Sequence, residues 1–180
     1  YGNRIAPGPD VDPETNRFET EGTGFGYDLA GNLTAETGAE YKYDAGNHMW
    51  SSQNAGGTVT YFYDGEGRRV KMVTPSVTRK FIYDPAGTLI AEYEGATLAK
   101  EYVYGASGLL ATVDDPGTAG QAVQYATPDH LGTPRAISDE NGAVSRHDYK
   151  PFGEEIGEAD NRTAALGYGT ADGVRQKFTS

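Results

Sequence analysis

A tyrosine followed by an aspartate recurs through the first two thirds of the chain, and a glycine follows each pair. Successive copies lie roughly 20 residues apart, a period typical of proteins built from one repeated supersecondary unit. The copies are Tyr27-Asp28 with Gly31, Tyr43-Asp44 with Gly46, Tyr63-Asp64 with Gly67, Tyr83-Asp84 with Gly87, and a degenerate fifth copy, Tyr104 with Gly108. The repeat therefore constrains the fold more than any other feature of the sequence.

Each period predicts a β-hairpin. Residues 58–63 are β-branched and aromatic, which favours a strand. Asp64 can accept a backbone N–H two residues on, and Gly67 tolerates positive φ, so a turn is expected between them. Residues 69–73 then return as a second strand. We expect an all-β fold of consecutive antiparallel hairpins, which form a sheet that curves and coils through its natural twist.

A second aromatic residue lies two positions before each repeat tyrosine. Residues i and i+2 of a strand share one face, so each hairpin presents an aromatic pair. The preceding residues are Phe25, Tyr41, Tyr61, Phe81 and Tyr102. We expect these pairs to pack across strands. The alternative is that exposed aromatics, Tyr41, Tyr61, Phe81 and Tyr102, stack on a carbohydrate ligand.

Composition excludes several classes of function. A net charge of −11 argues against nucleic-acid binding, which needs clustered cations. No apolar run approaches the roughly 20 residues that span a bilayer, and there is no cysteine. We expect no cofactor, because no nucleotide-binding glycine motif is present. Because the chain begins with Tyr1 rather than Met, we expect both ends to have been cut from a longer protein.

The turn residues divide the chain into five segments. Residues 1–15 are expected to be an extended lead-in, 16–113 the repeats, 114–120 a loop, 121–154 a further segment, and 155–180 a flexible insertion followed by more structure. The fourth segment predicts strands near 123–126, 135–138 and 144–149, with Asn141-Gly142 as a two-residue hairpin turn between the last two. A short helix is possible only near 164–166.

The Tyr-Asp-x-x-Gly repeat resembles that of YD-repeat proteins, which include bacterial RHS proteins and animal teneurins. The run Asp129-His130-Leu131-Gly132-Thr133-Pro134-Arg135, with Tyr149, Pro151, Phe152 and Gly153, resembles the front of the RHS repeat-associated core domain. Two positions depart from the family pattern, since Lys150 and Gly105 stand where it has aspartate.

The resemblance implies a fragment of a hollow β-shell from a secreted or surface protein of bacteria. Such a wall would enclose a C-terminal effector toxin or present a surface for cell contact. The implied partners are the rest of the shell and the effector. Glycans, cell-surface receptors and edge-to-edge self-assembly are further possibilities. A less favoured reading is an autoproteolytic segment, because Asp84-Pro85 begins a motif similar to RHS self-cleavage sites.

The candidate catalytic and metal-binding groups are expected to be structural. Asp129-His130 and His147-Asp148 are adjacent pairs, and neighbours in a strand point to opposite faces, so neither pair forms a dyad there. The third histidine, His48, has no partner at metal-ligand spacing. We therefore expect no catalytic residue, no metal site and no enzyme activity.

Overall fold

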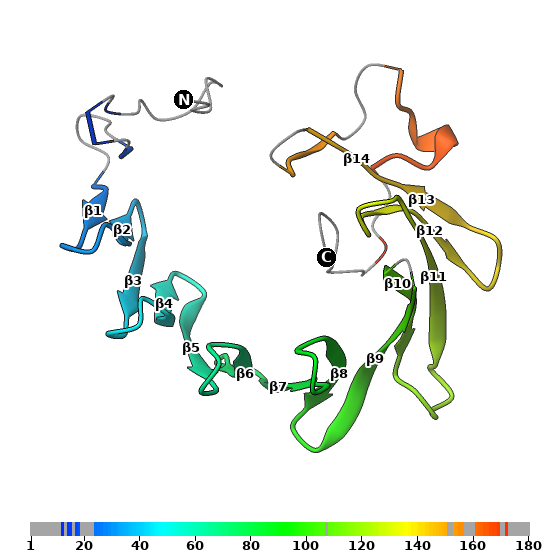
Figure 1. The fold of residues 1–180 in the computed structure, drawn as a ribbon, viewed down its shortest axis with the longest axis horizontal. Coiled ribbons are helices and arrows are strands. Elements are labelled where there is room, and N and C mark those ends of the chain that lie inside the picture. Colours follow the sequence, from blue (N-terminus) through cyan, green and yellow to red (C-terminus); the bar gives the residue numbers. More distant parts are fainter. Residues whose placement is uncertain are drawn as a thin grey trace. The chain divides into compact units, whose positions relative to one another are not determined.

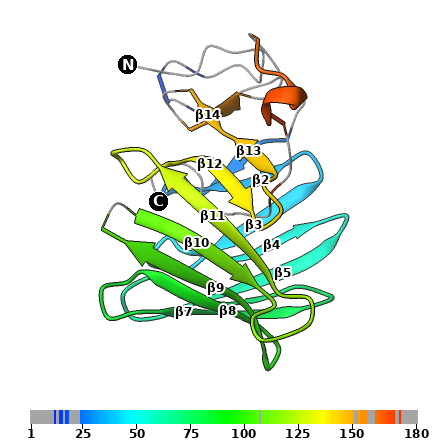
Figure 2. The same cartoon turned by 90° about the vertical axis from the view of Figure 1, so that its right-hand side faces the viewer.

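The structure is a computed structural model that describes residues 12, 14–15, 17–18, 24–106, 108–150, 153–156, 161–169 and 172. Within these residues the chain is almost entirely β (Figures 1 and 2). Thirteen described strands, β1 to β13, follow one another in chain order in one antiparallel sheet, which has β1 and β13 as its edges. The predicted all-β fold of consecutive antiparallel hairpins is confirmed. The predicted curvature and coiling of the sheet stay predictions.

Contacts divide the chain into two compact units, residues 1–80 and 81–180. The strands of the first unit are β1 (Gly26–Tyr27), β2 (Leu33–Glu36), β3 (Ala39–Tyr43), β4 (Met49–Asn54), β5 (Gly57–Tyr63) and β6 (Arg69–Val73), and β7 (Thr78–Tyr83) begins there. The hairpin expected from residues 58–63 and 69–73 corresponds to β5 and β6, in which Phe62 lies opposite Lys71.

The second unit contains the later strands of the main sheet and a separate two-stranded sheet. Its strands are β8 (Leu89–Glu94), β9 (Thr97–Gly105), β10 (Gly108–Asp114), β11 (Ala122–Pro128), β12 (Pro134–Asp139) and β13 (Val144–Arg146), with β14 (Asp148–Tyr149) paired to β15 (Glu155–Ile156). One turn of 3-10 helix, η1 (Ala164–Leu166), lies where a short helix was expected. No described helix is long and apolar enough to cross a membrane.

The strand expected over 144–149 is instead two strands. β13 ends at Arg146 and β14 begins at Asp148 in a different sheet. The residue between them, His147, is 2% exposed, and its ring nitrogens contact the carboxylates of Glu155 and Asp172. The sequence pattern did not predict this break, because its alternation of residue types continues across His147.

The core of the second unit lies on one face of its sheet. Its buried cluster consists of Tyr102, Leu109, Ala126 and Ile137, which come from β9, β10, β11 and β12. Tyr102 faces Thr112 across β9 and β10, and both are buried. Val103, the neighbour of Tyr102 along β9, is exposed on the other face. This alternation is what a strand with one buried face requires.

Charged side chains extend the same buried face. Lys100 is paired with Glu92 on β8 and with Asp114 on β10 in the strand register. The Lys100 ammonium lies 2.6 Å from the Asp114 carboxylate, and Glu92 accepts a 2.5 Å hydrogen bond from the Tyr102 hydroxyl. Glu92 is 2% exposed and Lys100 6%. Burial of these charges depends on their mutual contacts, because an unpaired buried charge is costly.

Candidate functional site

The repeated aspartate builds a compact hairpin turn, which Asp64 illustrates. The Gly67 amide donates to the Asp64 carbonyl oxygen at 3.1 Å, and the Asp64 amide donates to the Arg68 carbonyl oxygen at 3.0 Å. One carboxylate oxygen, Asp64 Oδ1, accepts from the amides of Glu66 at 3.0 Å and Arg68 at 2.8 Å. These four hydrogen bonds close the loop between β5 and β6. The Asx turn expected here is therefore present.

The same four hydrogen bonds recur at six aspartates among the described residues. They are Asp28, Asp44, Asp64, Asp84, Asp129 and Asp139. The last two lie beyond the predicted repeats, in the segment 121–154. The turn that closes the repeats therefore continues into the part of the chain that resembles the RHS core. The sequence signal was available, because both stretches keep the Asp-x-x-Gly spacing.

The fourth residue of each turn has left-handed backbone conformation. φ is +80° at Gly67, and the equivalent residues have similar values. In the second repeat this residue is Asn47, with φ of +62°, and the repeat glycine Gly46 lies one position earlier in the same turn. Glycine and asparagine both tolerate this conformation, so the two neighbouring residues were ambiguous in the sequence. The other equivalent residues are Gly31, Gly87, Gly132 and Gly142.

The predicted two-residue turn at Asn141-Gly142 is wrong. The Asp139 amide donates to the Ala143 carbonyl oxygen, and Asp139 Oδ1 accepts from the Asn141 amide at 2.9 Å. The loop between β12 and β13 therefore spans residues 140–143 and is a further copy of the aspartate turn. A carboxylate that captures two backbone amides stabilises this loop over the shorter alternative.

Two turns depart from this geometry. In the fifth repeat Gly105 pairs directly with Gly108, so β9 and β10 are joined by a two-residue loop. At Lys150 the backbone closes as in the other turns, since the Gly153 amide donates to the Lys150 carbonyl oxygen at 2.9 Å. Lysine cannot accept the two amides that aspartate accepts. Its ammonium instead donates to Glu154 at 3.0 Å.

Hydrogen bonds to the turn carboxylates favour their charged form. The backbone N–H of His48 lowers the pKa of Asp44, and the backbone N–H of Ala143 lowers the pKa of Asp139, each the largest single cause. A carboxylate whose pKa is lowered in the folded state stabilises the fold at pH values above its pKa in the unfolded chain, which is about 3.9. That contribution is lost as the pH falls through the lowered pKa values that these carboxylates have in the folded state.

Acid unfolding tests these carboxylates. We expect the melting temperature of the double variant Asp44→Asn and Asp139→Asn to fall less steeply below about pH 4 than that of the wild type, because asparagine keeps the turn geometry but does not titrate. Melting curves from pH 7 to pH 2 measure the slope. Glu140→Gln, at the exposed tip of the Asp139 turn, is the control and should leave the slope unchanged. Equal slopes in all three proteins would contradict the role of the carboxylates.

Successive turns contact one another in the first unit. The Asn32 side-chain amide donates to the Asn47 side-chain oxygen at 2.9 Å, which joins the first turn to the second. The His48 ring stacks on Tyr63 with centroids 4.8 Å apart and lies against Gly67, which joins the second turn to the third. His48 therefore packs between repeats, a role that spacing along the sequence did not indicate.

Repeat tyrosines use their hydroxyl groups to connect neighbouring strands. The Tyr63 hydroxyl donates to the Met49 carbonyl oxygen at 2.7 Å, and the Tyr61 hydroxyl lies 3.2 Å from Ser52 Oγ. The Tyr41 hydroxyl donates to Glu36. These contacts run across β2, β3, β4 and β5, and each ring packs on one face of the sheet while its hydroxyl is hydrogen-bonded.

Removal of the Tyr63 hydroxyl measures how much its hydrogen bond contributes to stability. We expect Tyr63→Phe to reduce the free energy of unfolding by about 1 kcal/mol, because the Met49 carbonyl oxygen loses a donor. Chemical denaturation measures the loss. Tyr125→Phe, at a residue 49% exposed, is the matched control and should change stability by less than about 0.5 kcal/mol. If both variants lose the same stability, the hydroxyl contact does not contribute.

The four aromatics considered for carbohydrate stacking differ in exposure. Phe81 is 7% exposed and Tyr102 5%, so neither ring offers a face to a ligand. Tyr41 and Tyr61 are partly exposed, and both hydroxyls already have protein partners. Carbohydrate binding through Tyr41 and Tyr61 stays a prediction.

The residues of the core-like motif lie in and beside the Asp129 turn. His130 and Leu131 are exposed at its tip, and Thr133 and Pro134 are buried at the start of β12. Gly132 occupies the left-handed position. Beyond the turn, Gly153 is left-handed at φ +84°. Pro151 and Phe152 lie outside the described residues.

Arg135 and Tyr149 connect the motif to β14. The Arg135 guanidinium contacts Asp129 at 2.9 Å and lies 3.8 Å from Asp148. It also lies over the Tyr149 ring, 5.6 Å from its centroid. Burial raises the pKa of Tyr149 to about 12, so its hydroxyl stays protonated at neutral pH.

Neither adjacent histidine–aspartate pair forms a dyad. Asp129 contacts the amides of its own turn and Arg135, while His130 is exposed. Asp148 binds Arg162 at 2.7 Å, while His147 binds other carboxylates. His130 lies in the Asp129 turn and His147 at the break between β13 and β14, so their aspartate neighbours are engaged by other partners.

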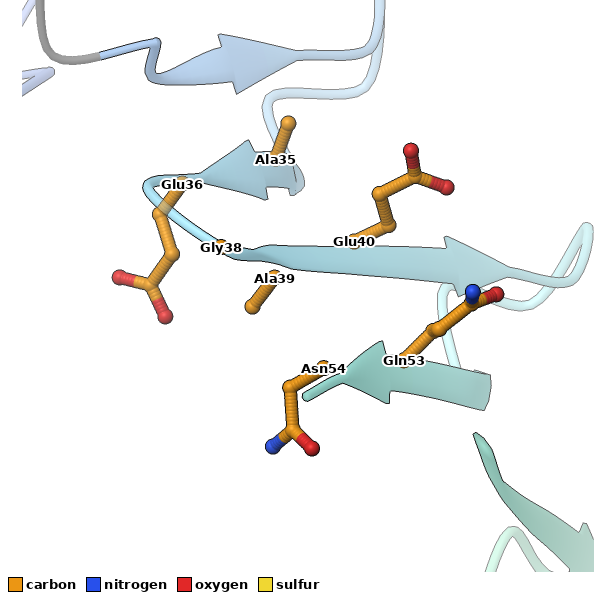
Figure 3. A pocket seen from close by; sticks show the side chains of 7 residues that line it. All are labelled: Ala35, Glu36, Gly38, Ala39, Glu40, Gln53 and Asn54. Atoms are coloured by element: carbon orange, nitrogen blue, oxygen red, sulfur yellow. The ribbon is translucent and has the colours of Figure 1, made fainter. Parts of the chain in front are cut away.

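A hollow in the first unit does not bring reactive groups together. It has a volume of about 290 Å³ and is lined by the ends of β2, β3 and β4. In Figure 3 the Glu36 and Glu40 side chains point to opposite sides of the ribbon. The described residues contain no cluster of three or more histidine, aspartate or glutamate side chains arranged to hold a metal.

Comparisons with known proteins find one matching family and several similar solved structures. The teneurin YD-shell family matches residues 15–176. Similar solved structures include TcdB2-TccC3 without its hypervariable C-terminal region, at 16% identity and a TM-score of 0.45 over 73% of this chain and 9% of that chain. Another is the Photorhabdus luminescens Tc holotoxin pore, at 15% identity and a TM-score of 0.39 over 74% of this chain and 10% of that chain. This chain thus spans about a tenth of those chains.

No curated protein matches the chain. The family match covers most of the sequence and includes both the five repeats and the core-like motif. It agrees with the resemblance drawn from the Tyr-Asp-x-x-Gly repeat. The chain belongs to the teneurin YD-shell family.

Proposed function

We propose that this chain is a section of a YD-shell wall that encloses a C-terminal effector polypeptide in a secreted or cell-surface bacterial protein. The observation that supports the proposal is the recurrence of one four-hydrogen-bond turn at six aspartates in a sheet whose strands follow chain order. Each hairpin is added beside the preceding one, so the wall grows with the number of repeats. Membership of the YD-shell family supports the same role.

We also propose that the role is structural and not enzymatic. The turn aspartates accept backbone amides, which leaves them as parts of the scaffold. Asp84, at the start of the motif similar to a self-cleavage site, forms an ordinary turn in which Oδ1 accepts from Ala86 and Thr88. Incubation of the complete protein tests this proposal. Cleavage within residues 1–180 that an Asp84→Asn change abolishes would overturn it.

Protease protection tests enclosure. In the complete natural protein, the proposed effector polypeptide is expected to resist a protease that rapidly digests the same polypeptide expressed alone. A triple variant, Gly31→Val, Gly67→Val and Gly87→Val, should open the wall and lose this protection, because each residue has positive φ. Gly65→Val, which meets no atom within 4 Å, is the control. Equal digestion of the enclosed and the isolated polypeptide would contradict the proposal.

A cell-contact surface that recognises glycans is the alternative. A glycan array separates the two proposals, because a wall that only encloses cargo needs no sugar ligand. Reproducible binding that Tyr41→Ala and Tyr61→Ala both abolish would favour the alternative.

A further inference from the structure

A row of lysine and aromatic side chains lies on one face of the sheet in the first unit. In β5, Phe62 lies between Tyr61 and Tyr63 and therefore points to the face opposite these tyrosines. Phe62 lies opposite Lys71 on β6, and Lys71 lies opposite Lys80 on β7. Partners across neighbouring strands share a face, so these three side chains form a row on the face away from the repeat tyrosines.

A third lysine lies on the same face, three strands before Lys71. Lys42 on β3 lies opposite Ser51 on β4, and Ser51 lies opposite Thr60 on β5. Thr60 is two residues before Phe62 in the same strand, so Lys42 and Phe62 share a face. The lysines therefore extend from β3 to β7 across one side of the sheet.

Two of the lysines lie over exposed aromatic rings. The Lys71 ammonium lies 3.8 Å from the centroid of the Phe62 ring, and the Lys42 ammonium lies 5.9 Å from that of Trp50. Both rings are 42% exposed. Contact with an aromatic ring positions a cation without neutralising its charge. The residues that form this surface, called the basic face below, are Lys42, Trp50, Phe62, Lys71 and Lys80.

The lysines of the basic face have no acidic partner among the described residues. None of the described ion pairs contains one of these three lysines. Residues 67–83 contain five arginines and lysines and no acidic residue, in a chain whose net charge is −11. Lys71 and Lys80 lie directly opposite each other, and like charges in that arrangement destabilise a sheet. An anion bound between them would relieve this repulsion.

The geometry of the basic face suits the side chains of an extended acidic peptide. Side chains at i and i+2 of an extended chain lie about 6.8 Å apart on one side. Neighbouring strands lie about 4.8 Å apart, and lysine has a long, flexible side chain. Two carboxylates at i and i+2 can therefore contact Lys71 and Lys80 together, while the carbon atoms of the peptide pack on Phe62.

Other classes of anion fit this surface less well. A sugar ring would stack on the aromatic faces, where the lysine ammoniums already lie. Nucleic acid carries a dense row of phosphates, of which three lysines would neutralise few. An anionic membrane is an extended plane, and a chain with a net charge of −11 is repelled by it. A narrow acidic peptide contacts the basic face alone, because charges more than about 8 Å away are largely screened at physiological ionic strength.

We propose that the basic face of the first unit binds an acidic segment of a partner polypeptide. The carboxylates of that segment contact Lys71 and Lys80, and its apolar atoms pack against the exposed rings of Phe62 and Trp50. Lys42 adds a third cation on the same face. This binding is separate from the role of the wall in enclosing an effector, and it does not depend on that role.

The fluorescence of Trp50 reports binding, because Trp50 is the single tryptophan of the chain. The probe is a synthetic peptide in which Glu and Thr alternate, and the same peptide with Gln in place of Glu is its neutral counterpart. We titrate each into the full 180-residue chain at low ionic strength, where surface charges interact most strongly. We expect the Glu peptide to change the emission of Trp50 in a saturable way and the Gln peptide to leave it unchanged.

Two variants connect the binding to the basic face. The double variant Lys71→Gln and Lys80→Gln should weaken the affinity for the Glu peptide by at least about fivefold, because two ion pairs are lost. Its melting temperature without peptide should not be lower than that of the wild type, because the repulsion between the two lysines is removed. Lys150→Gln removes the same charge from an exposed lysine of the second unit, and it is the matched control. It should change the affinity by less than about twofold.

Several results would overturn the proposal. No saturable change with the Glu peptide, equal affinity for the Glu and Gln peptides, or equal affinity of the wild type and the double variant would each do so. Heparin and vesicles that contain phosphatidylserine test the other anions. If either one binds through Lys71 and Lys80 and the Glu peptide does not, the partner is not an acidic polypeptide. If the double variant fails to fold, Lys80→Gln and Lys42→Gln, at exposed residues, decide between the same outcomes.

Discussion

Replacement of Lys100 by alanine is expected to lower the free energy of unfolding by about 3 kcal/mol, the low end of the cost of breaking a buried ion pair. Lys100 lies between Glu92 and Asp114 in the strand register, and its ammonium contacts Asp114 at 2.6 Å. Glu92 is almost fully buried, whereas Asp114 is about one third exposed, so water compensates for part of the loss at Asp114. The variant removes the cation that contacts Asp114 and lies opposite Glu92 in the register.

Urea denaturation of the protein measures this loss. Lys80→Ala is the control, because Lys80 is exposed and lies opposite another lysine, Lys71, in the register. It should change stability by less than about 0.5 kcal/mol. Lys100→Met separates charge from packing, since methionine restores most of the volume but not the charge. A loss in Lys100→Ala no larger than that in Lys80→Ala would show that the buried charges do not support the core.

Gly67→Val is expected to destabilise the first unit by about 2 kcal/mol. φ at Gly67 is +80°, where a β-branched residue is strained. An added Cβ would also lie 2.8 Å from His48 Nε2. His48 cannot move away without loss of its stacking on Tyr63 and its 3.3 Å contact with Asp44.

The matched control for Gly67→Val lies in the same turn. An added Cβ at Gly65 meets no atom within 4 Å, and Gly65 does not have positive φ. Gly65→Val should therefore cost less than about 0.5 kcal/mol. The double variant Gly67→Val with His48→Ala removes the close approach but not the backbone strain, so it separates the two causes. Equal stability of the Gly65 and Gly67 variants would contradict the turn geometry.

The hairpins were predictable because the signals for strand and turn agree in the first four repeats. Aromatic and β-branched runs end at an aspartate whose carboxylate captures the next amides, as at Tyr63-Asp64. The errors arose where two local solutions compete. Asn141-Gly142 alone suggests a shorter turn than the one that Asp139 stabilises.

Contacts between distant residues could not be predicted from local pattern. His147 meets Glu155 and Asp172 only after the chain has folded back, and no periodicity relates these positions. The same holds for Lys100 and Glu92, whose pairing depends on the register between β8 and β9. Register is set by strand pairing along whole hairpins, which a single sequence does not specify residue by residue.

The central claim is that one repeated aspartate turn closes hairpins along the sheet. Amide hydrogen exchange at the fourth residue of each turn tests this claim most directly. These amides donate to the aspartate carbonyl oxygen at Gly31, Asn47, Gly67, Gly87, Gly132 and Gly142. The predicted result is slow exchange at all six, far slower than at Gly65, whose amide donates in no described turn contact. Fast exchange at most of the six, at the rate of Gly65, would contradict a sheet built from one repeated turn.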